Sequence, residues 1–499
     1  MVFIILDKIF SMNPGYILAI ILVYFSFLLF IGWITGRKAD SESFFIGNRR
    51  SPWFIVAIGM LGSSLSGVTF ISVPGWVIDS QFSYMQMVLG YLVGYIVIAE
   101  VLLPLYYRLK LTSIYTYLEN RFGHYSYKTG ASFFLLSRTI GASFRLFLVA
   151  IVLQFTIFDA WNVPFAVTVI ITLALIWLYT FKGGIKTIIW TDTLQTIFML
   201  TAVILTVIYI SGSMDMNLGD IFHSVKENRL SRILFFDDIN DERHFLKQFL
   251  GGMFITIVMT GLDQDMMQKN LSCRNLKDAR KNVYTYSIAF VPVNLIFLVL
   301  GVLLVIYTSF AGMTLPEQPD NLFPLVATRG GLSPAVSMFF ILGLIAAAYS
   351  SADSALTALT TSFTVDILGR GGDEESKLKK VRFRVHIMFS FILMIVIMVF
   401  RLINDESVIS ALFTVAGYTY GPLLGMYSFG LFTRWKVYDH LVPYVAIASP
   451  LICVVLNTFS EVLLGGYKFG FELLVVNGLI TFLGMLIIRK KNSREEYGR

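Results

Sequence analysis

Repeated apolar runs are the feature that most restricts what this chain can fold into. A helix needs roughly 20 mostly apolar residues to cross a lipid bilayer, and the sequence contains thirteen such runs. Only 14% of the residues are charged, against about 25% in an average soluble domain. We therefore expect an all-α membrane protein with about thirteen transmembrane helices. Their centres lie near Ser26, Gly67, Tyr95, Gly141, Leu173, Ala202, Val258, Leu295, Ser350, Met394, Gly421, Ala448 and Ile480.

The positive charges give the expected orientation. Placing the N-terminus outside puts 28 of the 39 Lys and Arg residues in predicted cytoplasmic segments, 269–281 among them, and leaves the C-terminus in the cytoplasm. Cytoplasmic loops of membrane proteins carry such an excess. The net charge of +7 then follows from topology, so we expect a lipid bilayer around the protein and no nucleic-acid partner. No linker separates a second domain, and residues 1–499 are expected to form a single transmembrane domain.

Two of the predicted spans are interrupted. The second contains GSSLSG (Gly62–Gly67), and the seventh contains two glycines followed by TGLDQD (Thr260–Asp265). Each opens a group of five spans, and interrupted spans at matching positions in two halves point to a transporter binding site. Glycine and serine also permit close helix packing, which is our interpretation of GYTYGPLLG (Gly417–Gly425).

A polar stripe runs along the ninth predicted span, and a further acidic residue, Asp192, lies within the sixth. An ionisable group inside a membrane indicates a functional site by default, and hard cations prefer oxygen ligands. The pattern favours a weakly held monovalent cation. The alternative is that the serines bond back to their own helix. The stripe consists of Ala347, Ser350, Ser351 and Ser354 on one helix face, with Asp353 at its border.

An intramembrane enzyme is not expected. Such an enzyme needs an activated nucleophile or a metal cluster, and the sequence contains neither an HExxH nor a GxSxG pattern. A channel or a sensor is the alternative outside the class of carriers. Concentrative uptake into vesicles separates a carrier from both.

Six stretches of the sequence, taken together, are specific for one protein family: Ser41–Trp76, Arg108–Gly123, Trp190–Thr196, Asp263–Asn275, Ser350–Phe363 and Ala416–Phe432. Through them the chain resembles the sodium:solute symporter family, as a bacterial member located in the inner (plasma) membrane. The resemblance implies the five-plus-five inverted-repeat fold of the leucine transporter. Its parts would be an extra N-terminal helix (12–37), a first repeat (52–212), a second repeat (246–433) and two C-terminal helices (438–488).

The resemblance also implies the activity. The protein would import a small polar solute together with sodium, by alternating access. The solute would be a sugar, a sialate or another organic acid, with an amino acid or a vitamin as alternatives. The identity of the solute, the number of sodium ions and the oligomeric state stay open, a monomer included.

Sodium, as the transported coupling ion, would have two sets of ligands by this resemblance. A site shared by two core helices would use the carbonyls of Gly62, Leu65 and Ala347 and the hydroxyls of Ser350 and Ser351. Some members hold a second sodium, and the matching positions here are Asp192, Ser350, Asp353 and Ser354. Asp353 stands where the sialate-type pattern has a serine. A second sodium, a proton or an ion pair between Asp353 and Arg145 would each fit.

For the solute, the resemblance indicates Ser66 and Thr69 on the first interrupted span and Thr256 and Met259 on the seventh span. Met259 departs from the tyrosine of galactose carriers, and Val88 departs from a polar contact of sialate carriers. These departures argue against assigning either solute.

Two arginines, Arg138 and Arg145, lie on one face of the fourth span, because they are seven residues apart. Arg138 is about two or three turns from the inner end, at ~1.5 Å per residue, and we expect it to snorkel to the surface. Arg145 lies near mid-membrane and needs a partner. That partner is either a buried aspartate, with Asp353 foremost, or a solute carboxylate, which the guanidinium can bind with two hydrogen bonds.

Overall fold

The computed structural model describes residues 51–490 except 112, 181–184, 371–372 and 404–406, together with scattered positions between 15 and 30. Within these residues the secondary structure is helical, and the β-structure consists of two isolated bridges, Ser51 with Cys273 and Val437 with Arg489. Apolar runs form helices in a bilayer because each helix satisfies its own backbone hydrogen bonds.

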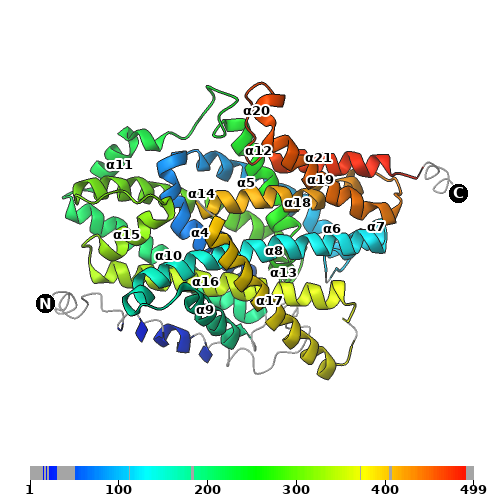
Figure 1. Cartoon of the computed structure of the whole chain (residues 1–499), viewed down its shortest axis with the longest axis horizontal. Helices are drawn as coiled ribbons and strands as arrows, with labels where there is room; N and C mark the ends of the chain where they lie inside the picture. The colour runs from blue at the N-terminus through cyan, green and yellow to red at the C-terminus, as the bar shows by residue number, and fades with distance from the viewer. Residues whose placement is uncertain are drawn as a thin grey trace.

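The helices follow one another in Figure 1 from blue to red. The α-helices are α4 (Trp53–Ser80), α5 (Tyr84–Val97), α6 (Leu103–Arg108), α7 (Thr116–Arg121), α8 (His124–Leu153), α9 (Phe165–Thr180), α10 (Ile185–Ser213), α11 (Leu218–Glu227), α12 (Phe245–Thr256), α13 (Gln264–Leu271), α14 (Leu276–Phe310), α15 (Leu322–Arg329), α16 (Pro334–Ser362), α17 (Glu375–Ile403), α18 (Val408–Phe432), α19 (Val442–Thr458), α20 (Ser460–Leu463) and α21 (Leu473–Ile487). Short π- or 3-10 segments are η2 (Ile98–Leu102), η3 (Gln154–Phe158), η4 (Asp159–Trp161), η5 (Arg229–Ser231), η6 (Ile257–Gly261), η7 (Pro319–Asn321), η8 (Phe363–Ile367) and η9 (Asp439–Leu441).

Eight of the described helices are long and apolar enough to cross a membrane, and the bent pair formed by α12–η6 and α13 makes a ninth span if it is counted as one. Shorter apolar helices lie at Phe165–Trp177, Pro334–Ala347 and Leu473–Ile487. Twelve of the thirteen predicted centres fall in helices of this set or their direct continuations. The first predicted helix, 12–37, lies mostly outside the described residues, so a total of thirteen is not established.

The first interruption is a break inside α4, as predicted. Ser66 has φ 28° and ψ 171°, which are not helical angles, and carbonyls of the turn before a helix break lose their regular partners. A neighbouring helix supplies one replacement, since Gln195 Nε2 of α10 donates to the carbonyl oxygen of Gly62 at 3.1 Å. The two helices are very close here. A Cβ at Gly62 would meet the backbone oxygen of Asp192 at 2.7 Å.

The second interruption is a bend of 68° between η6 and α13, again as predicted. The chain turns at Leu262 and Asp263, and the Asp263 side chain caps α13. Its Oδ1 accepts the backbone N–H groups of Asp265 at 3.0 Å and Met266 at 3.2 Å. An acidic cap of this kind satisfies donors at the start of a helix that have no partner within it.

Two tyrosines satisfy the carbonyls that this bend leaves free. Tyr106 Oη donates to the carbonyl of Gly261 at 2.9 Å, and Tyr115 Oη donates to the carbonyl of Leu262 at 3.1 Å. Irregular backbone at membrane depth is tolerated only where protein or water provides such partners. The bend is therefore stabilised by specific hydrogen bonds from neighbouring segments.

Close helix contacts hold both interrupted segments in the centre. In Figure 1, α4, α8 and α16 meet near the middle of the molecule, while α19–α21 lie at the upper right. α4 packs on α10, α14 and α16, and α5 packs on α12. In GYTYGPLLG, a Cβ at Gly421 would meet the Asn477 side chain at 2.2 Å, and one at Gly425 would meet Thr481 at 2.4 Å. The prediction that this stretch packs helices is confirmed.

Candidate functional site

A cavity of about 90 Å³ lies between the two interrupted segments, with walls from α4, α5, α8, α12, α14 and α18. All five residues that the sequence indicates for the solute line it: Ser66, Thr69, Arg145, Thr256 and Met259. Pockets for small molecules usually measure ~300–1,000 Å³. The space in this conformation is therefore smaller than such a solute needs.

The helices expected to share a sodium ion are in contact beside the break. Leu65 of α4 and Ala347 of α16 are fully buried, and a Cβ at Gly67 would lie 3.8 Å from the Cβ of Ala347. The expected carbonyl ligands Gly62 and Leu65 come just before Ser66, where the helical angles are lost.

Among the expected hydroxyl ligands, Ser351 is the most informative. Its Oγ is buried and has no hydrogen-bond partner among the described residues, and a buried hydroxyl without a partner is costly. Ser354, one turn further along α16, is also buried. The side chains of Ser350 and Asp353 lie outside the described residues.

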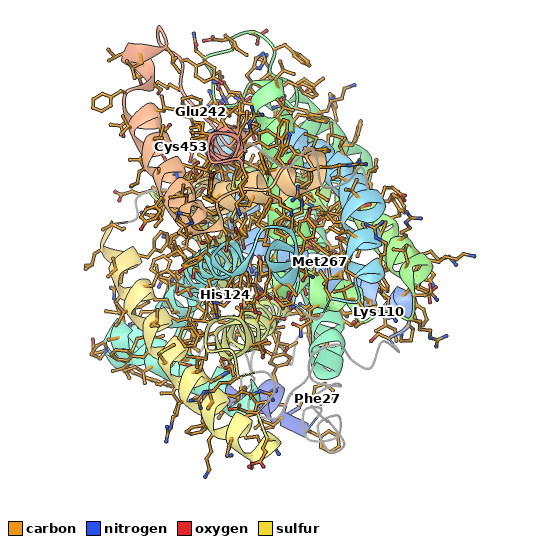
Figure 2. The ribbon with its side chains drawn as sticks, turned by 90° about the vertical axis from the view of Figure 1, so that its right-hand side faces the viewer. Phe27, Lys110, His124, Glu242, Met267 and Cys453 are labelled. Atoms are coloured by element: carbon orange, nitrogen blue, oxygen red, sulfur yellow. The ribbon has the colours of Figure 1, made fainter. Side chains whose placement is uncertain are left out.

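Asp192 is fully buried, and a lysine of opposite charge compensates it. Lys269 Nζ of α13 donates to Asp192 Oδ2 at 3.0 Å and to Ser63 Oγ at 2.7 Å. The Ser63 hydroxyl donates to the same Oδ2 at 2.6 Å. The sequence places Lys269 at the start of a predicted cytoplasmic segment, 269–281, and the structure shows that its side chain is buried in α13 rather than exposed in a loop. Met267 of the same helix is fully buried and lies between Glu242 and Phe27 in Figure 2.

Arg138 of α8 does not snorkel to the surface, so that prediction is wrong. Its side chain is only 7% exposed and forms an ion pair with Asp265 of α13. Its Nη1 lies 3.8 Å from Asp263 Oδ2, which also accepts a hydrogen bond from Tyr420 Oη at 2.8 Å. Depth along a helix does not reveal a partner from another segment, and Asp265 is 127 residues away in the sequence.

Arg145 lies two turns further along α8 and lines the cavity. Its Nε is buried without a hydrogen-bond partner, and no carboxylate among the described side chains forms an ion pair with it. Three basic and three acidic side chains thus gather here, of which five are buried and Arg145 is half-buried. We call them the ionic cluster: Arg138, Arg145, Lys269, Asp192, Asp263 and Asp265.

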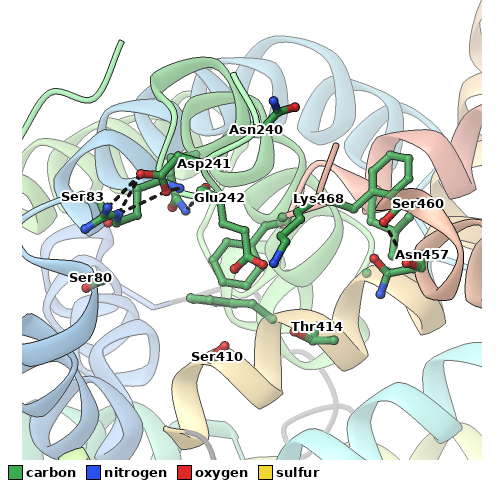
Figure 3. A pocket seen from close by; sticks show the side chains of 18 of the residues that line it. Ser80, Ser83, Asn240, Asp241, Glu242, Ser410, Thr414, Asn457, Ser460 and Lys468 are labelled. Atoms are coloured by element: carbon green, nitrogen blue, oxygen red, sulfur yellow. Dashed lines mark hydrogen bonds and ion pairs between the residues drawn. The ribbon is translucent and has the colours of Figure 1, made fainter. Parts of the chain in front are cut away.

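A larger pocket, the vestibule, adjoins the cavity and has a volume of about 640 Å³. Arg243 pairs with Asp241 at 2.8 Å, and Lys468 pairs with Glu461 at 3.0 Å. Glu242 points toward Lys468 in Figure 3. The excess of carboxylates favours cations in this space. The charged residues that line it are Asp79, Asp241, Glu242, Glu461, Arg243 and Lys468.

Four aromatic side chains, the aromatic seal, separate the vestibule from the cavity. Phe413 lines both spaces, Trp76 and Phe471 line the vestibule, and Tyr84 lines the cavity. Ring centroids are 5.8 Å apart for Trp76 and Tyr84, 6.4 Å for Tyr84 and Phe413, and 5.4 Å for Phe413 and Phe471.

Sequence reasoning missed the aromatic wall of the cavity. Tyr84, Tyr91 and Tyr95 of α5 line it, together with Phe290 and Phe413. The three tyrosines recur after seven and four positions, which places them on one helix face. That spacing was the available signal in the sequence.

Solved transporter structures share this fold. A sodium-coupled sialic acid symporter in a substrate-bound, outward-open state matches with a TM-score of 0.79 at 20% identity, over 96% of this chain and 100% of that one. The nucleobase-cation-symport-1 family transporter Mhp1, closed around bromovinylhydantoin, matches with a TM-score of 0.57 at 14% identity, over 90% and 95%. The fold is that of the leucine-transporter class, an all-helical membrane architecture with broken helices around a central cavity.

Within this class, the sequence identifies the family. The model of the sodium:solute symporter family matches residues 44–467, and the chain belongs to this family. It is 26% identical to the sodium-dependent multivitamin transporter of Oryctolagus cuniculus, over 80% of this chain and 63% of that protein. It is 27% identical to the human sodium-coupled monocarboxylate transporter 2, over 80% and 65%. The chain thus spans less than two thirds of these two relatives. The sodium/sialic acid symporter SiaT of Proteus mirabilis is 24% identical, over 83% and 84%.

Proposed function

We propose that this protein is a sodium-coupled symporter that imports a small organic anion by alternating access. The observation that carries the proposal is the central cavity. It lies between two broken helices and is lined by Arg145, which has no acidic partner among the described side chains. Ligand sites of carriers with this architecture lie where broken helices meet near the bilayer midplane.

Sodium is proposed to bind between α4 and α16. Its ligands would be the carbonyls of Gly62, Leu65 and Ala347 and the hydroxyls of Ser350 and Ser351. The buried Ser351 hydroxyl, which has no partner among the described side chains, supports this assignment. An ion held by two helices binds best in one arrangement of those helices, and only such a difference in affinity shifts a conformational equilibrium.

The solute is proposed to carry a carboxylate that Arg145 binds. A guanidinium presents two parallel donors that fit a carboxylate. Ser66, Thr69 and Thr256 would bind other polar groups of the solute, and Met259 would provide an apolar contact. Relatives named for monocarboxylates and for sialic acid support an organic acid over a neutral sugar or amino acid.

We further propose a bacterial plasma membrane as the location, with the N-terminus outside and the C-terminus in the cytoplasm. The excess of Lys and Arg in the predicted cytoplasmic segments supports this orientation. The proposed repeats are 52–212 and 246–433. Each opens on a broken helix, α4 in the first and α12–α13 in the second, which supports the division.

Uptake into proteoliposomes under an inward sodium gradient tests the proposal. We expect concentrative uptake of an organic acid from a panel of monocarboxylates, sialates, sugars and amino acids. Arg145→Lys keeps the charge but loses the paired donors. Since a hydrogen bond to a charged group is worth ~1.5–3 kcal/mol, uptake should fall by about 10- to 100-fold. The thermal shift on adding sodium should stay unchanged.

Arg401→Lys is the matched control, because Arg401 is exposed at the end of α17. Wild-type transport by Arg145→Lys, or a solute without an acidic group, would contradict the role of Arg145. Flux that never accumulates solute against its gradient would indicate a channel.

A further inference from the structure

Lys269 brings a fixed positive charge to the place where the sequence allows a second sodium. Its side chain is 3% exposed, and its Nζ contacts Asp192 Oδ2 and Ser63 Oγ at 3.0 and 2.7 Å. A carboxylate and a hydroxyl are oxygen ligands of the kind that a small hard cation prefers. The ammonium group therefore lies among the ligands that an ion at Asp192 would use.

We propose that Lys269 takes the place of a second sodium ion at Asp192, so that one sodium is coupled to each solute. The inference rests on the proposed sodium symport and adds its stoichiometry. A buried carboxylate needs one compensating charge, and Lys269 provides it. A sodium ion beside the same carboxylate would meet the ammonium at close range and be repelled.

The surrounding charges support this assignment. Among the described side chains, the ionic cluster contains three basic and three acidic residues, so it is neutral without any bound ion. Asp265 lies one turn before Lys269 on α13, and its own partner is Arg138. Before the solute binds, a second sodium would leave these six side chains with a net positive charge.

Replacing Lys269 should change the number of sodium ions. In proteoliposomes held at zero membrane potential, the sodium gradient at which net solute flux stops gives the ratio of sodium to solute, and we expect one for the wild type. Lys269→Gln removes the ammonium from beside the Asp192 carboxylate and the Ser63 hydroxyl. The ratio should rise to two, with a sodium Hill coefficient above one, since the Hill coefficient is limited by the number of sites.

Binding to the purified protein gives a readout that does not depend on transport. The Lys269→Gln variant should bind two labelled sodium ions per chain, and its melting temperature should rise more with added sodium than that of the wild type. Lys269→Arg keeps the charge and serves as the control, with a ratio of one. The double variant Asp192→Asn/Lys269→Gln removes both charges, so its ratio should return to one.

Three results would overturn the proposal. They are a wild-type ratio of two, a folded Lys269→Gln variant that still binds one sodium, and a double variant that binds two. If Lys269→Gln does not fold, the wild-type ratio and the double variant still decide. Uptake that needs no sodium at all would refute the proposed symport instead, which keeps the two failures distinct.

Discussion

Replacing Asp320 by asparagine should remove a pH dependence from the stability of the folded protein. Asp320 lies in η7, between α14 and α15, and its side chain is buried. Its Oδ2 accepts the backbone N–H of Val408, at the start of α18, at 2.8 Å. Burial raises the pKa of Asp320 to about 6. The N–H of Val408 and the hydroxyl of Ser72 lower the pKa by smaller amounts, and the negative charge of Asp79 raises it slightly.

The sign and size of the effect follow from this pKa. The ordinary value is 3.8, so between about pH 4 and 6 the folded state binds the proton more tightly than the unfolded state does. The contribution to stability is fully present below the ordinary pKa and is lost as the pH rises through about 6. A difference of roughly two pKa units corresponds to about 3 kcal/mol of unfolding free energy.

Unfolding of the protein in detergent micelles, followed by tryptophan fluorescence from pH 4 to 7.5, measures this term. We expect the free energy of unfolding of the wild type, relative to Asp320→Asn, to fall by about 2.5 kcal/mol across this range, since the proton is not fully bound to the folded state's advantage until below pH 3.8. Asp238→Asn, at an exposed loop position, controls for the loss of one charge. A difference between wild type and Asp320→Asn that is flat or rises with pH would show that the Asp320 carboxyl is not buried as described.

Two further substitutions test the ion site and the ionic cluster. Ser351→Ala removes one proposed sodium ligand, so the sodium concentration for half-maximal uptake should rise about tenfold for a contact worth ~1.4 kcal/mol, and unchanged sodium dependence would argue against that ligand. Arg138→Gln leaves Asp263 and Asp265 buried without their main partner, which should cost about 3–5 kcal/mol of stability. A melting temperature equal to that of the wild type would contradict it.

The sequence alone predicted those features of the fold that depend on a local pattern of residues. Apolar length placed the spans, and glycine and polar residues inside apolar runs placed both breaks, because each depends only on neighbouring residues. Ser66 has non-helical angles within GSSLSG, and the bend after Gly261 falls within TGLDQD. The five residues indicated for the solute also line one cavity; the family resemblance suggested four of them, and Arg145 followed from its place in an apolar span.

Pairing between distant segments was not predictable in the same way. Lys269 was counted among cytoplasmic charges, since it begins a segment rich in Lys and Arg. Its partner Asp192 is 77 residues away, on α10. The prediction for Arg138 was wrong for the same reason, because its partner Asp265 is 127 residues away in the sequence. A local signal did exist for Lys269, because Asp265 precedes it by four residues and the short α13 then carries two charges on one face.

The proposed solute and ion sites are joined by a continuous series of contacts. Arg145 and Arg138 lie on one face of α8. A solute bound to Arg145 therefore acts on the same helix whose Arg138 pairs with Asp265 of α13. One turn further along α13, Lys269 reaches Asp192 and the Ser63 hydroxyl, next to the proposed sodium ligand Gly62.

Such a series transmits coupling only if one of its elements has two arrangements, and the bend between η6 and α13 is where the chain can provide them. Opening the vestibule side separates aromatic contacts worth ~0.5–1.5 kcal/mol each, whereas moving α13 away from α8 and α10 breaks buried ion pairs worth several times more. The vestibule side should therefore open at lower cost, and coupling of solute to sodium should depend on whether α13 moves. If α13 moves, Arg145→Lys and Lys269→Gln combined should change the apparent sodium affinity by an amount different from the sum of their separate effects. Strictly additive effects would show that the two sites are not coupled through α13.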